Sequence, residues 1–243
     1  PAAFVCVRLC DVAPNGSSTR VTYAISNLTH INGADKPIKL VAGKRYSVRV
    51  PLIDTAYSFL KGHRIRIAVS TTYWPLIWPS PQPVTLTLWA GKSALELPVR
   101  PPRKEDRTPP RFKPVEAAPA FAKTALSAGY RNRVVHTDMG TGVTVVEVND
   151  DSGRNRYDDI DLEAQARSTE RYSVSEHDPL AATAEVTWSW VFERKDWKIR
   201  TESRTQMSCT KRDFILKASL TAYEGENKVF ERTFDEVIAR NGN

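Results

Sequence analysis

Apolar and polar side chains alternate along much of the first hundred residues. A period of two places successive side chains on opposite faces of a β-strand, and this pattern is clearest in three segments, 46–52, 64–69 and 84–88. Three further strands are expected between turn-forming clusters, at 4–10, 21–27 and 95–99. No long amphipathic helical pattern interrupts them, so the alternation predicts a β-sandwich or jelly roll.

A second series of strands is expected after residue 130. It begins with short segments at 134–135, 142–148 and 170–174 and continues with four longer ones at 185–193, 197–209, 214–223 and 229–238. The connections between the longer segments are short and polar, which favours an antiparallel meander. The fold class is therefore predicted to be all-β, a jelly-roll or β-sandwich followed by a second antiparallel sheet region. Residues 117–128 are the one segment expected to form a short helix.

Proline marks the division between these two regions. Fifteen of the 16 prolines lie at or before position 119, and residues 101–119 are especially rich in them. Proline lacks the amide donor and biases the preceding residue toward extended geometry, so this segment is predicted to be a stiff linker or strap. The predicted organisation is a jelly roll at 1–100, a linker at 101–119 and a β-meander extension at 120–243.

The net charge of +7 raises the question of nucleic-acid binding, but its distribution argues against it. Residues 1–100 carry 12 basic and 4 acidic side chains, whereas residues 134–243 carry 15 basic and 21 acidic ones. The basic residues alternate with core positions along strands, as in residues 64–67, instead of gathering on one face with aromatic side chains. We expect no nucleic-acid partner, and the opposite charges favour mutual docking of the two regions.

Other features exclude further classes of function. No apolar run reaches the roughly 20 residues of a membrane helix, and the first ten residues lack the layout of a signal peptide. The three cysteines, Cys6, Cys10 and Cys209, have neither zinc-ligand spacing nor an even number for disulfides. Buried thiols in a reducing cytoplasm are expected, with no membrane association, metal or cofactor.

Three motifs in the first hundred residues point to a known family. They are the runs VRLCDVAPNGSS at 7–18, GHRIRIAVS at 62–70 and YWPLIWP at 73–79. In this order they resemble the carboxy-terminal domain of the CocE/NonD hydrolases, which include the X-Pro dipeptidyl-peptidases and cocaine esterase. Asn15 departs from the aspartate more usual in the family's turn, a change confined to that loop. Residues beyond 100 resemble an extension carried by one subgroup.

The resemblance implies a three-part enzyme: an α/β-hydrolase domain with a Ser-His-Asp triad, a helical cap, and a jelly roll beside the active site. Only the jelly roll matches this sequence. The nucleophile elbow G-x-S-x-G does not occur, so no catalytic residue can be carried over and this chain is expected to lack the triad. The family's jelly roll has strands before the one corresponding to residues 4–10, so we expect the sequence to begin inside the domain. The expected partner is an α/β-hydrolase domain of the same polypeptide.

Tyr73, Trp74 and Trp78 form the most suggestive cluster for a substrate or domain interface. Two neighbouring prolines, Pro75 and Pro79, would hold these rings rigidly, and aromatic rings give large contact areas at low entropic cost. In the intact enzyme the rings would face the acyl pocket or the catalytic domain. The alternative is that they pack only on the core of the jelly roll or on the linker.

Three other groups of polar residues are weaker candidates for a catalytic or metal site. His63 with Asp54 and Ser70 would supply the residue types of a triad, but nothing provides an oxyanion hole at a recognisable spacing. The sequence His177-Asp178-Pro179 favours a turn. The carboxylate-rich runs at 150–153 and 158–161 do not follow the calcium-loop pattern.

Three functions remain open at this point. The first is a non-catalytic C-terminal region that scaffolds a serine hydrolase, an esterase or X-Pro dipeptidyl-peptidase, and helps shape its substrate pocket. The second is an independent carbohydrate- or protein-binding jelly roll that uses Trp74, Trp78 and Trp89 as a platform. The third assigns a ligand cavity or oligomer interface to the meander. A sandwich without its first strands would have an unpaired edge, which favours a homodimer.

Overall fold

The computed structural model of the 243-residue chain describes residues 2–108 and 110–241. Pro1, Pro109, Gly242 and Asn243, which belong to the predicted domains and linker, lie outside the described residues. The described chain is all-β, with antiparallel sheets and short 3-10 turns but no α-helix. The predicted fold class is therefore confirmed. In the part of the chain that the structure describes, no helix is long and apolar enough to cross a membrane.

The smaller sheet has three strands in the order β2-β1-β3. β1 (Phe4–Val12) is central and pairs antiparallel with both β2 (Ser18–Asn27) and β3 (Arg64–Ser70). A tight turn joins β1 to β2: Gly16 adopts φ +89° and its amide donates to the carbonyl oxygen of Ala13 at 2.9 Å. Glycine suits this left-handed conformation because it has no Cβ. β1 supplies most of the buried apolar side chains in this region.

Three of the predicted jelly-roll strands are not formed. Residues 46–52, 84–88 and 95–99 have no strand pairing in the described structure. A period of two shows which side chains share a face, but a strand also needs a neighbour for its backbone hydrogen bonds, and these segments have none among the described residues. η1 (Leu28–His30) and η2 (Ala90–Lys92) are the short turns of this region.

The larger sheet contains nine strands, seven of which follow the order β12-β11-β10-β9-β8-β6-β5. Its strands are β4 (Lys123–Ala125), β5 (Tyr130–Asp138), β6 (Val143–Asp151), β7 (Asn155–Tyr157), β8 (Leu162–Ser175), β9 (Thr183–Arg194), β10 (Trp197–Cys209), β11 (Asp213–Glu224) and β12 (Asn227–Ala239). β7 pairs with β8 and β4 with β7 beside the main path. η4 (Asp158–Ile160) and η5 (Pro179–Ala181) connect strands. The predicted meander from β9 to β12 is thus observed.

The two faces of the larger sheet differ in polarity. Residues paired across antiparallel strands share a face, and the registers of β9, β10 and β11 define one face that carries charge only at the strand ends, at Arg194 and Glu224. We call the uncharged residues of this face that lie between those strand ends the apolar face: Ala184, Val186, Trp188, Trp190, Phe192, Ile199, Thr201, Ser203, Thr205, Met207, Cys209, Phe214, Leu216, Ala218, Leu220 and Ala222. The opposite face carries charged side chains such as Glu185, Arg204 and Lys217.

The helix predicted at residues 117–128 is wrong, because part of this segment forms the strand β4. β4 pairs with β7, and beyond it the amides of Leu126 and Ser127 both donate to the carbonyl oxygen of Arg154. Helix propensity is a weak preference that pairing with an available strand can override. Among the described residues between 100 and β4, the one regular element is the short turn η3 (Lys104–Arg107).

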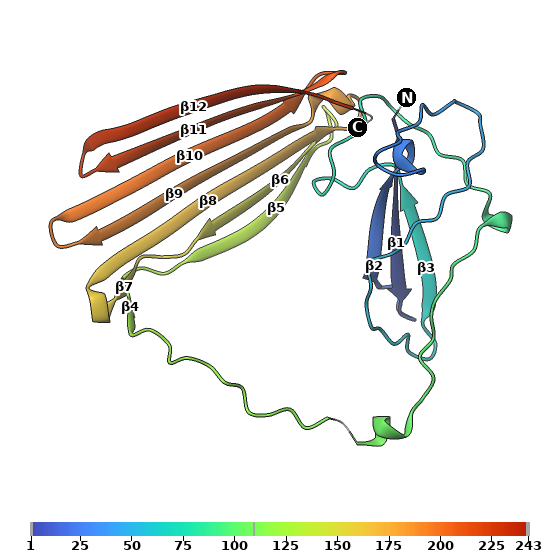
Figure 1. The fold of residues 1–243 in the computed structure, drawn as a ribbon, viewed down its shortest axis with the longest axis horizontal. Coiled ribbons are helices and arrows are strands. Elements are labelled where there is room, and N and C mark those ends of the chain that lie inside the picture. Colours follow the sequence, from blue (N-terminus) through green and yellow to red (C-terminus); the bar gives the residue numbers. More distant parts are fainter. Residues whose placement is uncertain (1, 109, 242–243) are drawn as a thin grey trace.

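The two sheets meet at one end and diverge at the other (Figure 1). The C-terminal end of β12 lies near the smaller sheet at this junction. Residues 101–108 and 110–122 run between the far ends of the two sheets, so the described chain surrounds an open V (Figure 1). The domain boundaries predicted from the sequence stay predictions.

Candidate functional site

The loop after β3 carries the three aromatic residues singled out from the sequence. The Trp74–Pro75 peptide bond is cis, and the carbonyl oxygen of Tyr73 accepts hydrogen bonds from the amides of Leu76 and Ile77 at 2.9 and 3.2 Å. This turn bends the chain so that Trp74 and Trp78 lie against each other, their ring centroids 5.4 Å apart at an interplanar angle of 75°. Edge-to-face packing of this kind adds to the stabilisation from burial.

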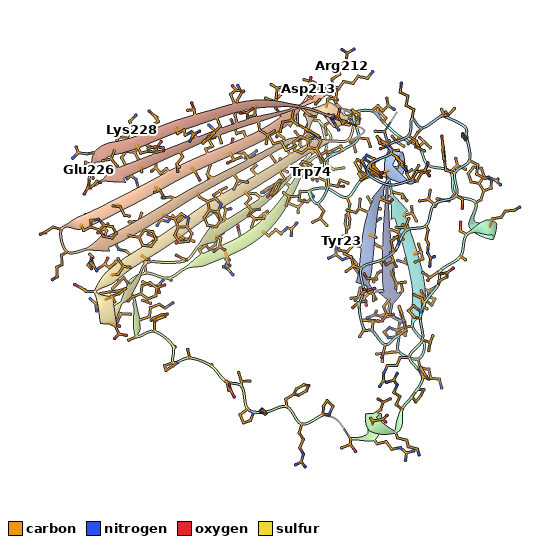
Figure 2. The ribbon with its side chains drawn as sticks, viewed as in Figure 1. Tyr23, Trp74, Arg212, Asp213, Glu226 and Lys228 are labelled. Carbon is orange, nitrogen blue, oxygen red and sulfur yellow. The ribbon has the colours of Figure 1, made fainter. Side chains whose placement is uncertain are left out.

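Both tryptophans also pack against the larger sheet. The Trp74 ring lies 6.3 Å from Tyr172 of β8, and the Trp78 ring lies 6.0 Å from Phe214 of β11, both in edge-to-face geometry. Tyr172 pairs with Ala184 across β8 and β9, and Phe214 belongs to the apolar face. The tryptophans therefore cover one end of that face. Figure 2 shows Trp74 at this junction between the sheets.

Arg240 closes the junction from the end of the chain. Its guanidinium lies 4.6 Å from the centre of the Phe214 ring, and its Nη2 donates a 2.7 Å hydrogen bond to the carbonyl oxygen of Pro79. Burial lowers the pKa of this guanidinium from its ordinary value. Burial, followed by the hydrogen bond that the Tyr172 hydroxyl donates to Glu170, raises the pKa of Tyr172 to about 12. Tyr172 therefore keeps its proton at neutral pH.

Tyr73 faces the smaller sheet instead. Its ring packs edge-to-face on Tyr23 of β2 at 5.5 Å, the Arg8 guanidinium lies 5.0 Å from its centre, and Arg20 donates a hydrogen bond to its hydroxyl. The three residues thus divide: Tyr73 packs on the first sheet, and Trp74 and Trp78 pack together on the second. The alternative weighed from the sequence, packing only on the jelly-roll core or on the linker, does not describe this arrangement, and contact with a catalytic domain stays a prediction.

The residues opposite the cluster were missed from the sequence. Tyr172, Phe214 and Arg240 lie about 100 residues or more from Trp74 along the chain, and each sits on a strand or strand end with no motif of its own. The sequence showed only that alternation along its strand places Phe214 on an apolar face. Three buried polar atoms at the junction, Trp74 Nε1, Trp78 Nε1 and Ser80 Oγ, have no hydrogen-bond partner among the described residues.

The carbohydrate platform is not assembled as the sequence suggested. Trp74 and Trp78 meet each other edge-on and face the second sheet, so they do not present a flat open surface. Trp89 is 44% exposed, but the Arg45 guanidinium lies 4.1 Å from its ring centre. No observation on these three rings favours sugar stacking.

The triad imagined around His63 does not form. His63 Nδ1 lies 2.8 Å from Oδ1 of Asp11, which is 5% exposed, and Tyr57 donates a hydrogen bond to Asp11 Oδ2. Ser70 lies elsewhere: its hydroxyl donates to the carbonyl oxygen of Thr72 and accepts from Arg8. His63 is thus paired with Asp11 and not with Asp54. No spacing in the sequence could reveal this, because it depends on the pairing of β1 with β3.

The carboxylate-rich runs are occupied by protein partners. Asp151 accepts hydrogen bonds from Gln165, Arg167 and the amide of Gly153, and Asp158 pairs with Arg156. In the described ranges, no group of three or more His, Cys, Asp or Glu residues could hold a metal ion. The predicted turn at 177–179 is confirmed, since the Asp178 side chain accepts a hydrogen bond from the amide of Leu180.

Comparison with known proteins identifies the family. The model of the X-Pro dipeptidyl-peptidase C-terminal non-catalytic domain matches residues 1–130, more than half of the chain. The match includes the smaller sheet, the aromatic loop and the proline-rich segment. No curated protein and no solved structure matches the chain. The chain belongs to the family of X-Pro dipeptidyl-peptidase C-terminal non-catalytic domains.

Proposed function

We propose that this chain is the C-terminal, non-catalytic region of a serine hydrolase that cleaves acyl esters or X-Pro amides. In this proposal residues 1–100 support an α/β-hydrolase domain of the same polypeptide and help shape its substrate pocket. The family match carries the proposal, because its members are non-catalytic C-terminal domains of X-Pro dipeptidyl-peptidases. The missing nucleophile elbow and the unassembled triad around His63 agree with a chain that does no chemistry of its own.

The surface of residues 1–100 also supports a neighbouring domain. Large apolar side chains lie exposed along the unpaired segments and β3, among them Ile53 at 56%, Leu60 at 64%, Ile65 at 50% and Leu88 at 58%. Many large exposed apolar side chains within one region are expected where another protein surface covers them. Because β1 is held between two strands and buried, the surface has a rigid support.

The activity test compares the parent polypeptide with the 243-residue chain. We expect the parent to hydrolyse p-nitrophenyl acetate or an X-Pro p-nitroanilide and to be labelled covalently by a fluorophosphonate. The 243-residue chain should do neither. Turnover by this chain alone, or a parent that neither hydrolyses these substrates nor takes up the label, would overturn the proposal.

The scaffolding role needs its own variants in the parent. Leu60→Lys and Leu88→Lys place a charge on the proposed contact surface, and Lys92→Gln removes an exposed charge from a turn as the matched control. We expect both lysine variants to lower the thermal midpoint of the catalytic domain or its kcat/KM, while the control leaves both unchanged. Equal behaviour of all three variants would argue against scaffolding by this surface.

A further inference from the structure

The apolar face of the larger sheet lies uncovered over most of its area. Its sixteen side chains on β9, β10 and β11, all within the described residues, are uncharged, and the same face of these strands carries charge only at the strand ends, at Arg194 and Glu224, whereas the opposite face carries eight charged residues. Large members of the apolar face are nevertheless exposed, with Trp188 at 39%, Trp190 at 43% and Leu220 at 37%. Loss of charged residues from the centre of a surface is characteristic of the core of a protein interface.

The row of rings on β9 strengthens this comparison. Trp188, Trp190 and Phe192 stack along the strand with neighbouring centroids 5.9 and 6.0 Å apart and planes within 10° of each other. Rigid aromatic side chains at the centre of an apolar patch are typical of residues that dominate binding energy. The charged side chains of this side of the sheet lie at its margins, with Glu170 on β8, Arg232 on β12, and Arg194 and Glu224 at the ends of β9 and β11, as the polar rim of an interface would.

The available area is sufficient for a stable interface. Five strands of about twelve residues, β8 to β12, span roughly 40 Å by 24 Å at the usual strand rise and spacing, or about 950 Å². A standard interface buries about 800 Å² on each partner. The apolar face with its two flanking strands is therefore large enough to hold a folded domain.

Two sets of aromatic contacts on one loop join this face to the smaller sheet. Tyr73 packs on Tyr23 of the smaller sheet, and the next residue, Trp74, packs with Trp78 against Tyr172 and Phe214 of the larger one. Figure 2 shows Tyr23 on the side of the smaller sheet that looks toward the larger one, with Trp74 between the two sheets. A partner that rests on this side of residues 1–100 would also face the apolar face across this junction.

We propose that the apolar face binds the α/β-hydrolase domain of the same polypeptide, so that this domain is held between the two sheets. The inference rests on the proposed function and extends it, because it gives the second sheet a partner that the family match, which ends at residue 130, does not assign. The C-terminal extension then acts as a second clamp on the catalytic domain, opposite the jelly-roll region.

The arrangement of the chain favours this occupant over a second copy. Face-to-face packing of two such sheets requires an unobstructed approach to each face. The smaller sheet and residues 101–108 and 110–122 stand around the same open V (Figure 1). These parts would block the approach of a second sheet. They would not block an α/β-hydrolase domain of the same polypeptide that folds inside the V. The exposed Phe112, Val115 and Phe121 of the connecting segment then lie within reach of the same partner.

Cysteine accessibility tests the inference directly. Ser203→Cys places a thiol at the centre of the apolar face, and Glu202→Cys places one on the adjacent residue of the opposite face. Both are made in a Cys209→Ser background, in the parent polypeptide and in the 243-residue chain. Maleimide should label both cysteines in the short chain, but in the parent the rate at position 203 should fall at least tenfold while the rate at position 202 stays the same.

A second pair of variants tests the energetic role. Leu220→Lys charges the apolar face and Thr221→Lys charges the opposite face of the same strand. In the parent we expect Leu220→Lys to restore labelling at position 203 and to lower the thermal midpoint of the catalytic domain, with Thr221→Lys doing neither. Circular dichroism of the 243-residue variants checks that the sheet is intact.

The outcomes separate this inference from the proposed function. An active parent whose position 203 is labelled as fast as in the short chain overturns the inference and leaves the proposed function standing. Protection that disappears on dilution, together with a dimer in sedimentation, shows that a second copy covers the face and also overturns it. A parent with no hydrolase activity and no fluorophosphonate label removes the proposed function, and the inference falls with it.

Discussion

Arg240 donates a hydrogen bond to the carbonyl oxygen of Pro79 across a separation of 161 residues. The same guanidinium covers the ring of Phe214, which in turn packs against Trp78. One side chain at the end of β12 thereby connects the aromatic loop of the first sheet with the second sheet. The angle between the two sheets depends on this small set of contacts.

Replacing Arg240 by methionine should loosen the junction. The substitution keeps the apolar stem but leaves the buried carbonyl oxygen of Pro79 without this donor, which costs about 1–3 kcal/mol in similar cases. We expect faster amide hydrogen exchange in residues 73–80 and a red shift of tryptophan emission. Arg232→Met is the matched control, because Arg232 also stacks on a phenylalanine, Phe234, but away from the junction. Similar exchange in both variants would contradict this role.

Trp78 should contribute more to stability than Trp89. Trp78 packs on both Trp74 and Phe214, so truncation to alanine creates a cavity at the junction and should cost about 2–4 kcal/mol, less than a fully buried ring can. Trp89 is 44% exposed and its main ring partner is Arg45, so Trp89→Ala should cost about 1 kcal/mol or less. Urea unfolding followed by circular dichroism measures both values. A larger loss for Trp89→Ala would show that the junction does not stabilise the fold.

The strands of the meander were predictable because each one carries its own signal. The segment 197–209 was expected as a strand and coincides with β10, since alternating side chains and short polar connections fix both ends. The same alternation at 84–88 failed, because a strand also requires a partner that local sequence does not specify. Alanine-rich residues around Thr124 were expected to be helical, but the strand at 155–157 gave them a pairing edge.

The candidate site was only half predictable. Tyr73, Trp74 and Trp78 were visible as a dense aromatic cluster beside prolines, and the structure packs Trp74 against Trp78 but places Tyr73 on Tyr23 of the smaller sheet. Their partners Tyr172 and Phe214 were not, because contacts between strands far apart in sequence leave no periodic trace. The partner of His63 was hidden for the same reason.

The three cysteines should differ in reactivity. Cys6 is fully buried in β1, and burial raises the pKa of its thiol, which lowers the fraction of reactive thiolate. Cys10 is 8% exposed, whereas Cys209 is partly exposed at the end of β10. We expect a disulfide reagent to modify Cys209 first in the native protein, with Cys6 and Cys10 reacting at the rate of unfolding. Mass spectrometry of timed samples measures this order, and early modification of Cys6 would contradict the burial of β1.

The buried Asp11 should make stability depend on acid pH. The Tyr57 hydroxyl, with a further contribution from His63, holds the pKa of the Asp11 carboxyl below its ordinary value of 3.8. Because the folded pKa is the lower one, the carboxylate favours the folded state at pH values above 3.8. That contribution is lost progressively as the pH falls through the folded pKa.

Two variants test this origin of acid sensitivity. Asp11→Asn removes the titrating group, so its free energy of unfolding should fall less steeply than that of the wild type below about pH 4. Tyr57→Phe removes the largest cause of the lowered pKa, so its folded pKa should move back toward the ordinary value and the acid-dependent loss should become smaller. Urea unfolding at a series of pH values between about 2 and 6 gives these slopes. Identical slopes for the wild type and both variants would show that the Asp11 carboxylate does not link folding to protonation.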